Sequence, residues 1–246
     1  MKTTQTLLTV LGSLALAGSA NAQLIAQWTF EGDVLTPSTG SGTASNVGGT
    51  SSAFAAGNGG GRGWNTSSYP AQSTGSGTAG VEFLVSTLGY KDITVSYDHR
   101  ASGTASRWAA FQYTTDGSTW TTLGNNSGGL SPHDTFYSFN FDLSSTAGVN
   151  NNPNFGFRIV SIFSPLAFNQ NSTLSYGADA AYMRANADAK YPPEAGLGTS
   201  NYSTAGTWRF DNVTVSGSVI PEPHEYAMLA GLGLVGFAIW RRRAAK

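Results

Sequence analysis

The fold is decided by a stretch near the C-terminal end of the chain, WRFDNVTV at residues 208–215. Apolar and polar residues alternate along it, as expected for a β-strand that buries one face. The alternation changes phase once, because the two aromatic residues occupy even positions and the two valines occupy odd positions. One extra residue restores a common face, so we predict a β-bulge near Asp211-Asn212 that turns both apolar pairs inward.

The same period of two recurs through the body of the chain. Ile93, Val95 and Tyr97 alternate with polar residues, and residues 137–143 repeat the pattern. Further strands are predicted at 24–30, 81–85, 108–113, 120–123, 155–163 and 208–216. Because no segment of the body shows a long helical period, we predict an all-β antiparallel sandwich over residues 23–218. Its first and last strands should pair or lie close together.

Two stretches between the predicted strands differ in character. Residues 36–80 are rich in Gly, Ser, Thr, Asn and Ala and lack an apolar period, which predicts a long surface loop. A structureless loop of that length is uncommon in a compact domain, so we allow for a short strand within it. Residues 114–120 contain Asp116-Gly117, which predicts a hairpin turn because glycine accepts a positive φ.

Composition excludes several classes of function. The chain of 246 residues carries 13 Lys and Arg against 14 Asp and Glu, so no long-range field attracts nucleic acid. It contains no cysteine, which removes disulfides, thiolate metal sites and thiol catalysis. We therefore predict a protein without a nucleic-acid partner.

Residues 1–22 have the pattern of a secretory signal peptide. Met1-Lys2 provides a positive start, an apolar run follows, and Ala20-Asn21-Ala22 supplies the small residues that signal peptidase accepts. We predict cleavage after Ala22, so that the exported chain begins at Gln23.

Residues 219–246 contain a predicted transmembrane helix at about 226–240. The flanking signals are a proline triplet and an arginine cluster: Pro221, Glu222, Pro223, Arg241, Arg242 and Arg243. An apolar stretch at about 1.5 Å per residue covers roughly 22 Å here, less than the roughly 30 Å hydrocarbon core. Interfacial aromatic and arginine side chains can extend this span. The positive-inside bias then places the C-terminus in the cytoplasm and the body on the far side of the membrane.

This tail resembles the PEP-CTERM sorting signal of Gram-negative bacteria, in which a proline-flanked motif, an apolar helix and an arginine cluster follow in the same order. The resemblance implies that an exosortase recognises the tail and removes it. It also implies that the body, first anchored at the inner membrane, is delivered to the cell envelope or the extracellular polysaccharide matrix. An ordinary single-pass anchor is the alternative.

The body resembles the jelly-roll modules found in such sorted proteins. The likeness lies in the ending at residues 208–213 and in the hairpin at residues 112–117. It implies a jelly-roll-like sandwich and says little about activity.

Three acidic residues are candidates for a structural calcium site. Glu31 and Asp33 follow the first predicted strand, and Asp211 lies at the predicted bulge. If the terminal strands are neighbours, these carboxylate oxygens can converge on Ca2+, which prefers oxygen ligands. Sugar-binding jelly rolls often hold calcium between their terminal strands, and this arrangement is similar. The alternative is that the three acids are solvated at the rim.

Aromatic residues gather in the loop-like segment 164–206. Aromatic faces beside arginine and asparagine side chains are what sugar recognition requires. The candidate ligand-binding residues are Tyr176, Tyr182, Tyr191 and Tyr202. The alternative is that these rings cover a sheet edge or the core.

No complete catalytic constellation is visible. The body holds only two histidines, and His99 continues the apolar face of its strand, which favours a packing role. Glu82 and Asp98 point away from their apolar faces and could share one sheet surface, as the two carboxylates of a glycoside hydrolase would. We predict no catalytic residues and a non-enzymatic protein of the envelope or matrix that binds glycan or is purely structural. A secreted polysaccharide hydrolase is the alternative.

Overall fold

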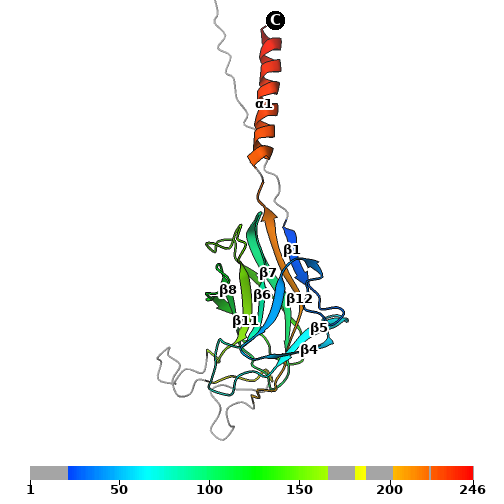
Figure 1. Ribbon diagram of the computed structural model, residues 1–246, viewed down its shortest axis with the longest axis vertical. Helices are drawn as coiled ribbons and strands as arrows, with labels where there is room; N and C mark the ends of the chain where they lie inside the picture. The colour runs from blue at the N-terminus through cyan, green and yellow to red at the C-terminus, as the bar shows by residue number, and fades with distance from the viewer. Residues whose placement is uncertain (1–21, 166–180, 187–201, 222, 246) are drawn as a thin grey trace, which may run out of the picture.

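The computed structural model describes residues 22–165, 181–186, 202–221 and 223–245. Ala20, Tyr176, Tyr191 and Glu222, which the sequence singled out, lie outside these ranges. Two antiparallel β-sheets form the body, and one helix follows the last strand (Figure 1). The predicted all-β antiparallel sandwich is therefore confirmed for the described residues.

The larger sheet, termed sheet A, has seven strands. They are β1 (Gln23–Trp28), β2 (Thr39–Gly40), β4 (Ser51–Ala56), β5 (Arg62–Ser67), β7 (Tyr90–Ala101), β10 (Tyr137–Asp142) and β12 (Trp208–Val219). Five of them run in the order β10-β7-β12-β1-β2, while β5 pairs with β12 and β4 pairs with β5.

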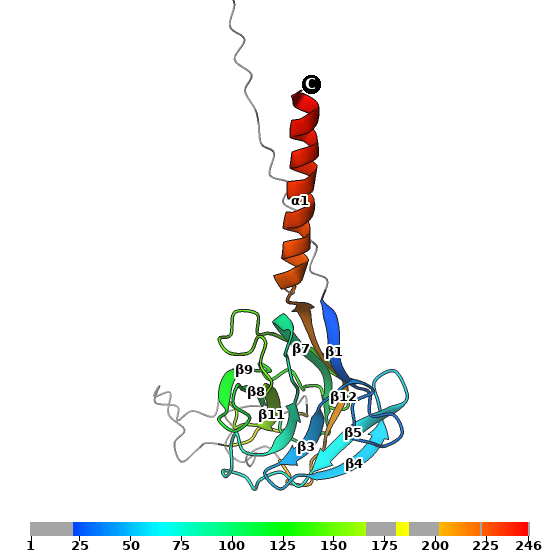
Figure 2. The same ribbon diagram turned by 45° about the horizontal axis from the view of Figure 1, so that its top comes forward.

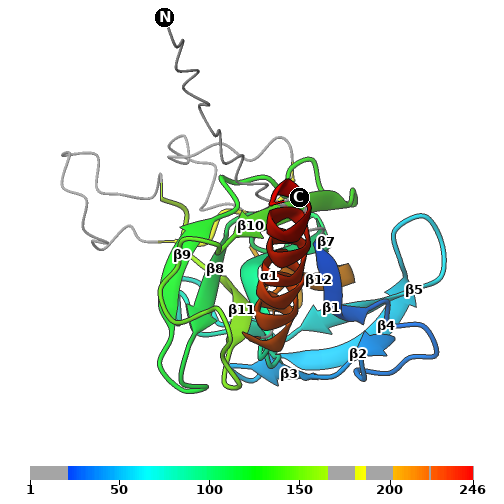
Figure 3. The ribbon, with the colours of Figure 1, turned by 90° about the horizontal axis from the view of Figure 1, so that it is seen from above.

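The smaller sheet, termed sheet B, has five strands. They are β3 (Thr43–Val47), β6 (Gly80–Leu84), β8 (Ala109–Thr114), β9 (Thr121–Asn125) and β11 (Gly156–Ser161). Their order is β3-β6-β11-β8-β9. Seen from above, β8 and β9 lie on the opposite side of the body from β4 and β5 (Figure 3).

Strand β12 joins the parts of sheet A. One edge pairs with β7, from Trp208 opposite Ala101 to Val219 opposite Tyr90. The other edge is shared, because β5 pairs with residues 208–210 and β1 pairs with residues 213–217. The first and last strands are thus neighbours, as predicted.

The predicted bulge in β12 is confirmed. The register between β12 and β7 shifts between Asp211 and Thr214, and Asn212 has a φ of 49°. Asparagine is among the residues that adopt this left-handed conformation most readily. The two aromatic residues before the bulge and the two valines after it are all fully buried. The extra residue therefore keeps one continuous apolar face along the whole strand.

Aromatic side chains fill the space between the sheets. The ring of Trp28 meets Phe83 edge-on, with centroids 5.0 Å apart, and Trp64 meets the same ring at 5.9 Å. Tyr97 of sheet A stacks over Phe111 of sheet B at 6.5 Å. Full burial of a large apolar side chain contributes about 1.5–3 kcal/mol, so these contacts hold the two layers together.

The prediction of a long surface loop over residues 36–80 is wrong for much of that segment. Strands β2, β3, β4 and β5 lie within it, with β3 in sheet B and the other three in sheet A. Most side chains of β2, β3 and β4 are exposed or only partly buried. Small polar residues therefore suffice there, and the apolar alternation that identifies a strand is missing. The hairpin predicted at residues 114–120 is confirmed, since it joins β8 to β9 and Gly117 has a φ of 77°.

Helix α1 (Pro223–Ala244) continues from β12 and projects away from the sandwich (Figure 2). From residue 230 to residue 245 the apolar side chains of the helix are exposed, with Leu234 at 71% and Trp240 at 56%. Within the ranges that the structure describes, no helix has the length and apolarity needed to cross a membrane. The transmembrane helix predicted at 226–240 is therefore not supported.

His99 is a fully buried member of the inward face of β7, in line with the predicted packing role. Its ring stacks on Phe210 at 4.3 Å and lies edge-on to Trp208 at 4.6 Å. Among the described residues, neither ring nitrogen has a hydrogen-bond partner. Burial lowers the pKa of His99 well below its ordinary value, so the folded protein holds a neutral imidazole.

We expect the free energy of unfolding to fall as the pH drops from about 7 to about 5, because the unfolded chain binds a proton at His99 that the folded chain cannot bind. This stability is complete above the unfolded pKa of about 6.5 and is lost below it by up to about 1.4 kcal/mol per pH unit. His99→Phe keeps the stacked ring and should lose this component in urea denaturation, whereas His133→Gln should retain it. An unchanged pH dependence in His99→Phe would contradict the assignment.

Candidate functional site

Five side chains form one row across the outer face of sheet B. The strand register places them directly opposite one another from edge to edge: Ser45, Glu82, Arg158, Gln112 and Thr122. Neighbouring strands lie about 4.8 Å apart, so the row extends for about 19 Å. These five residues are termed the polar row.

Contacts within the sheet hold the polar row in place. Arg158 Nε donates to Gln112 Oε1 at 2.5 Å, and Gln112 Nε2 donates to Thr122 Oγ1 at 3.1 Å. The half-buried Trp120 stands beside the row, with its ring centroid 4.6 Å from Arg158 Cζ, in a cation–π contact. The side chains of Arg158, Gln112 and Thr122 are therefore ordered before any ligand binds, which lowers the entropy cost of binding.

The charges of the polar row balance. Glu82 and Arg158 are directly opposite each other on β6 and β11. Burial raises the pKa of Glu82, and the positive charge of Arg158 acts in the opposite direction. Burial lowers the pKa of Arg158, which the charge of Glu82 opposes. With one carboxylate and one guanidinium, the row suits an uncharged polar ligand.

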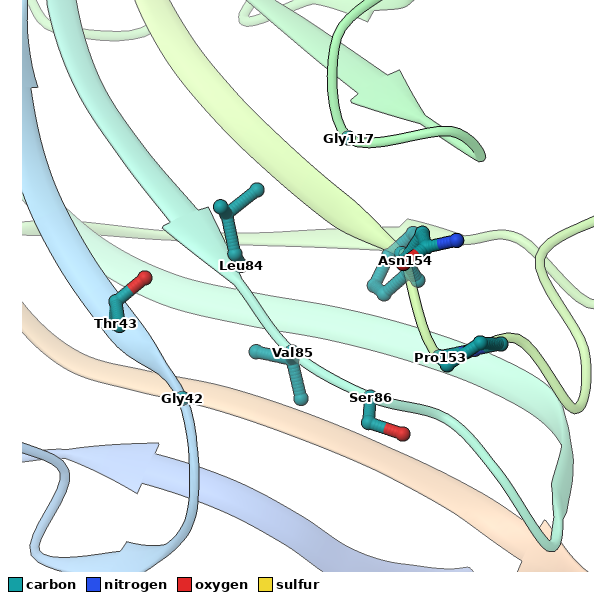
Figure 4. A pocket seen from close by; sticks show the side chains of 9 residues that line it. Gly42, Thr43, Leu84, Val85, Ser86, Gly117, Pro153 and Asn154 are labelled. Carbon is teal, nitrogen blue, oxygen red and sulfur yellow. The ribbon is translucent and has the colours of Figure 1, made fainter.

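A pocket of about 260 Å³ adjoins the polar row at one end of the sheet. It is lined by Gly42, Thr43, Leu84, Val85, Ser86, Gly117, Pro153, Asn154 and Phe155. Figure 4 shows Thr43 and Leu84 on one side of this space and Pro153 and Asn154 on the other. Thr43 and Leu84 lie two residues beyond Ser45 and Glu82 of the polar row. The pocket therefore extends the same outer face.

Gly156 keeps the connection between the polar row and the pocket open. It lies opposite Leu84 and Thr114, and it precedes Arg158 by two residues on β11. A Cβ atom at this position would lie 2.5 Å from Leu84 Cδ2 and 2.8 Å from the carbonyl oxygen of Phe83. No larger residue fits there without displacing the neighbouring strand.

The outer face of sheet B is covered at the end that lies away from the pocket. Val160 and Ala110 point outward from sheet B, yet their side chains are 0% and 3% exposed. The backbone N–H of Gly77 donates to the carbonyl of Ser161 at 2.8 Å, which fixes the segment before β6 over this end. The open surface comprises the polar row, Trp120 and the pocket, and is termed the sheet-B face.

Arg158, Gln112 and Trp120 are not among the site residues that the sequence predicts. A signal was present, because Arg158 and Gln112 occupy polar positions of alternating strands and so must point away from the core. Trp120 shares the parity of the outward-facing Thr122. The missing information was the register across five strands, which brings residues 112, 120 and 158 together.

A second polar cluster surrounds the bulge on the outer face of sheet A. Asp98 and Asp211 are directly opposite each other, and both are buried. The backbone N–H of Asn58 donates to Asp211 at 2.7 Å, and its side-chain amide donates to Asp98 at 2.9 Å. Asn212 bridges the same two carboxylates with two bonds of 2.8 Å. Burial raises the pKa of Asp211, and the nearby charges of Asp98 and Glu31 add to this effect.

The three predicted calcium ligands do not all meet. Glu31 Oε1 accepts the backbone N–H of Arg62 at 3.0 Å and lies close enough to Asp211 to raise its pKa. Asp33 instead forms an ion pair with the guanidinium of Arg62, with Nε and Oδ1 2.5 Å apart. Across the described ranges, no group of three acidic or histidine side chains is placed to hold a metal ion. Asp98, which the sequence did not assign to this site, takes the place next to Asp211, and calcium stays a prediction.

The predicted tyrosines have packing roles where the structure describes them. Tyr182 is 0% exposed, so its ring faces are not available to a sugar, contrary to the prediction. It stacks on the half-buried Tyr202 at 4.6 Å, and the two hydroxyls donate to the carbonyls of Thr74 and Pro70. These contacts bind the segment before β6 to the body. Tyr176 and Tyr191 lie outside the described residues.

The carboxylates of the hydrolase alternative are separated. Glu82 lies on the outer face of sheet B, whereas Asp98 lies on the outer face of sheet A, with the aromatic core between them. They cannot flank one glycosidic bond, which requires two carboxylates within about 10 Å.

The predicted processing residues lie at one end of the body, where the start of β1 pairs with the last residues of β12. Gln23, the predicted first residue after cleavage, is also the first residue of β1. Ala22 and Pro221 are exposed, and Pro223 is the first residue of α1. Arg241, Arg242 and Arg243 form the basic last turn of that helix and are exposed.

No protein-family model and no curated protein matches the chain. Among solved structures, it is similar to carbohydrate-binding modules. The family 22 xylan-binding domain of Xyn10C from Paenibacillus barcinonensis is 11% identical, with a TM-score of 0.42 over 81% of this chain and 97% of that domain. The family 11 module of Clostridium thermocellum, in complex with a mixed-linked tetrasaccharide, is 12% identical, with a TM-score of 0.36 over 81% of this chain and 100% of that module.

Other similar structures are longer than this chain. The family 22 and catalytic modules of xylanase 10B from Clostridium thermocellum, complexed with xylohexaose, are 11% identical, with a TM-score of 0.41 over 73% of this chain. This chain covers 27% of that structure and 50% of the tandem family 22 modules of Xyn10C. At these identities and TM-scores, neither a ligand nor a site residue can be transferred.

Proposed function

We propose that the chain is an exported, non-enzymatic protein of the cell envelope or extracellular polysaccharide matrix whose sheet-B face binds a neutral glycan. One observation carries the proposal. Trp120, the Arg158 guanidinium and the hydrogen-bonding side chains of the polar row lie together on an open, charge-balanced face beside a pocket.

The chemistry of this face matches that of a sugar chain. A pyranose ring has an apolar face, which can pack on the indole of Trp120, and equatorial hydroxyls, which bond to Arg158, Gln112 and Glu82. The row of about 19 Å is long enough for several rings of an extended polymer. The pocket beyond Leu84 provides a place for a branch or a chain end.

Binding without turnover is favoured over hydrolysis. Glu82 is the carboxylate of the polar row, and its companion in the hydrolase alternative lies on the opposite face of the sandwich. His99 does not replace it, because that side chain is fully buried between the two sheets. A secreted hydrolase is therefore kept as an outcome of the binding experiment, where it would release reducing ends.

The sheet-B face is tested by Trp120→Ala in a screen of immobilised neutral polysaccharides and soluble oligosaccharides. We expect wild-type protein to bind without releasing reducing sugar, and Trp120→Ala to bind at least about tenfold more weakly, because an aromatic anchor is lost. Trp240→Ala, which removes an exposed tryptophan of α1, is the matched control and should bind like the wild type. Equal binding by Trp120→Ala and wild type would exclude this face, and released reducing sugar would favour the hydrolase.

We further propose that residues 1–22 direct export and that the tail at 219–246 is an exosortase substrate. Support comes from the exposed apolar surface of α1 and its basic last turn, which suit contact with a membrane and its anionic surface. Sorting of this kind would leave the sandwich outside the cytoplasm, within reach of matrix polysaccharide.

Sorting is tested by expression in a Gram-negative host that encodes an exosortase, followed by fractionation and intact-mass measurement. We expect the body to reach the matrix fraction without its tail, and the double variant Pro221→Ala, Pro223→Ala to keep the tail and stay with the membrane. A wild-type chain that keeps both ends in the cytosol would rule this proposal out.

We also propose a structural calcium ion beside Asp211. Asp98 and Asp211 are buried opposite each other, and no described lysine or arginine forms an ion pair with either. Two such carboxylates repel each other, and a hard cation with oxygen ligands relieves the repulsion. Glu31 and backbone carbonyls of the neighbouring loop are further oxygen donors, while Asp33 stays with Arg62.

Calcium is expected to raise the melting temperature by about 5–10 °C when its concentration exceeds Kd about 100-fold. Asp211→Asn should abolish this rise, and in a chelator it should melt no lower than the wild type because one of two repelling charges is removed. Asp92→Asn serves as the control, because it removes an exposed carboxylate near the start of β7. A wild-type melting temperature that is the same in calcium and in chelator would end the calcium proposal.

A further inference from the structure

A pair of like charges faces the solvent on sheet A. Arg100 of β7 lies directly opposite Arg209 of β12. This pair is two residues along each strand from the pair of Asp98 and Asp211. Both side chains point away from the core, because the adjacent His99 and Phe210 point inward. Like charges directly opposite each other on neighbouring strands are destabilising. Arg100 and Arg209 are termed the arginine pair.

The fold does not neutralise Arg209. Arg100 forms an ion pair with Asp134, and Arg62 forms one with Asp33, whereas Arg209 has no ion pair with any described carboxylate. Burial lowers the pKa of Arg209, the charges of Arg100 and Arg62 lower it further, and only Asp134 acts in the opposite direction. Positive charge therefore predominates around this guanidinium.

The arginine pair retains unused hydrogen-bond donors. Arg209 donates from Nε to Asn65 Oδ1 at 3.3 Å and from Nη1 to the carbonyl of Ala56 at 2.8 Å. Arg100 donates from Nη2 to Asp134. No hydrogen bond between described residues uses Nη2 of Arg209 or Nε and Nη1 of Arg100. The contacts to Asn65 and Ala56 fix the plane of the Arg209 guanidinium, so its free edge has a defined direction.

We propose that the arginine pair binds a carboxylate group of an acidic sugar, such as a uronate residue carried by the matrix polysaccharide. Two guanidinium groups can hold one planar carboxylate through charge-assisted, bidentate hydrogen bonds. The bound anion would also relieve the repulsion between the two arginines. This inference rests on the proposed function for its ligand class, and it adds a second contact on the face opposite the sheet-B face.

The surroundings favour a single anionic group over a polyanion. Residues 23–218 carry eight basic and twelve acidic side chains, so the body as a whole repels a densely charged polymer such as DNA. Asp134 and Asp33 flank the arginines and restrict the positive surface to one small area. A polysaccharide with scattered uronate residues fits this limited charge, and its neutral stretches fit the sheet-B face.

The test uses the full chain with tetragalacturonate, its carboxyl-reduced neutral counterpart and a sulfated tetrasaccharide. We expect calorimetry to show wild-type protein binding tetragalacturonate about tenfold more tightly than the reduced form, as one charge-assisted contact implies. Arg209→Gln and Arg100→Gln should each lose the preference, while Arg107→Gln, which bonds to Gly128 elsewhere, should keep it. Both test variants should melt at or above the wild-type temperature, which separates lost binding from misfolding.

The outcomes distinguish this inference from the proposed function. Equal binding of acidic and reduced oligosaccharides overturns the arginine site and leaves the sheet-B face standing. A preference that depends on Arg209, together with binding of the reduced oligosaccharide that is unchanged in Trp120→Ala, supports the arginine site and overturns the sheet-B face. Tighter binding of the sulfated oligosaccharide overturns the carboxylate assignment, and binding of none of the three by any variant overturns both proposals.

Discussion

The pairing of strand β12 with three other strands is the constraint on which the rest of the structure depends. β7 occupies one of its edges, and β5 and β1 occupy successive parts of the other. A straight strand could not bury both of its apolar pairs, so the bulge near Asp211 is required for a continuous core. The same bulge places the Asp211 carboxylate on the outer face, opposite Asp98. Core packing and surface chemistry are thus set by one local irregularity.

The two outer faces of the sandwich differ in the charge they present. The sheet-B face has one carboxylate and one guanidinium, and the guanidinium is hydrogen-bonded to the neutral side chain of Gln112. The outer face of sheet A carries a carboxylate pair and an arginine pair on adjacent rows. The two proposals assign the neutral rings of a polysaccharide to the sheet-B face and its acidic groups to the arginine pair. Binding at opposite faces would let a single molecule cross-link separate chains of a matrix.

The sequence predicted features that depend on neighbouring residues and missed those that depend on distant ones. The bulge follows from a change of phase within eight residues, and the hairpin at Gly117 follows from one dipeptide. Strands β2 to β4 were missed because they expose small polar side chains. The polar row needs the register of five strands, and Tyr182 was assigned to a ligand because its contact with Thr74, 108 positions away, leaves no local trace. The calcium prediction grouped Asp211 with Glu31 and Asp33, whereas Asp33 forms an ion pair with Arg62 and Asp98 lies opposite Asp211.

The most direct test of the account is an NMR titration of the isotope-labelled chain with the neutral oligosaccharide that binds most tightly in the glycan screen. Chemical-shift changes should be confined to the side-chain signals of Trp120, Arg158 and Gln112, to the amides of β3, β6, β8, β9 and β11, and to the residues that line the adjoining pocket. Changes restricted to sheet A or to α1, with the Trp120 indole signal unmoved at saturation, would contradict a glycan-binding sheet-B face.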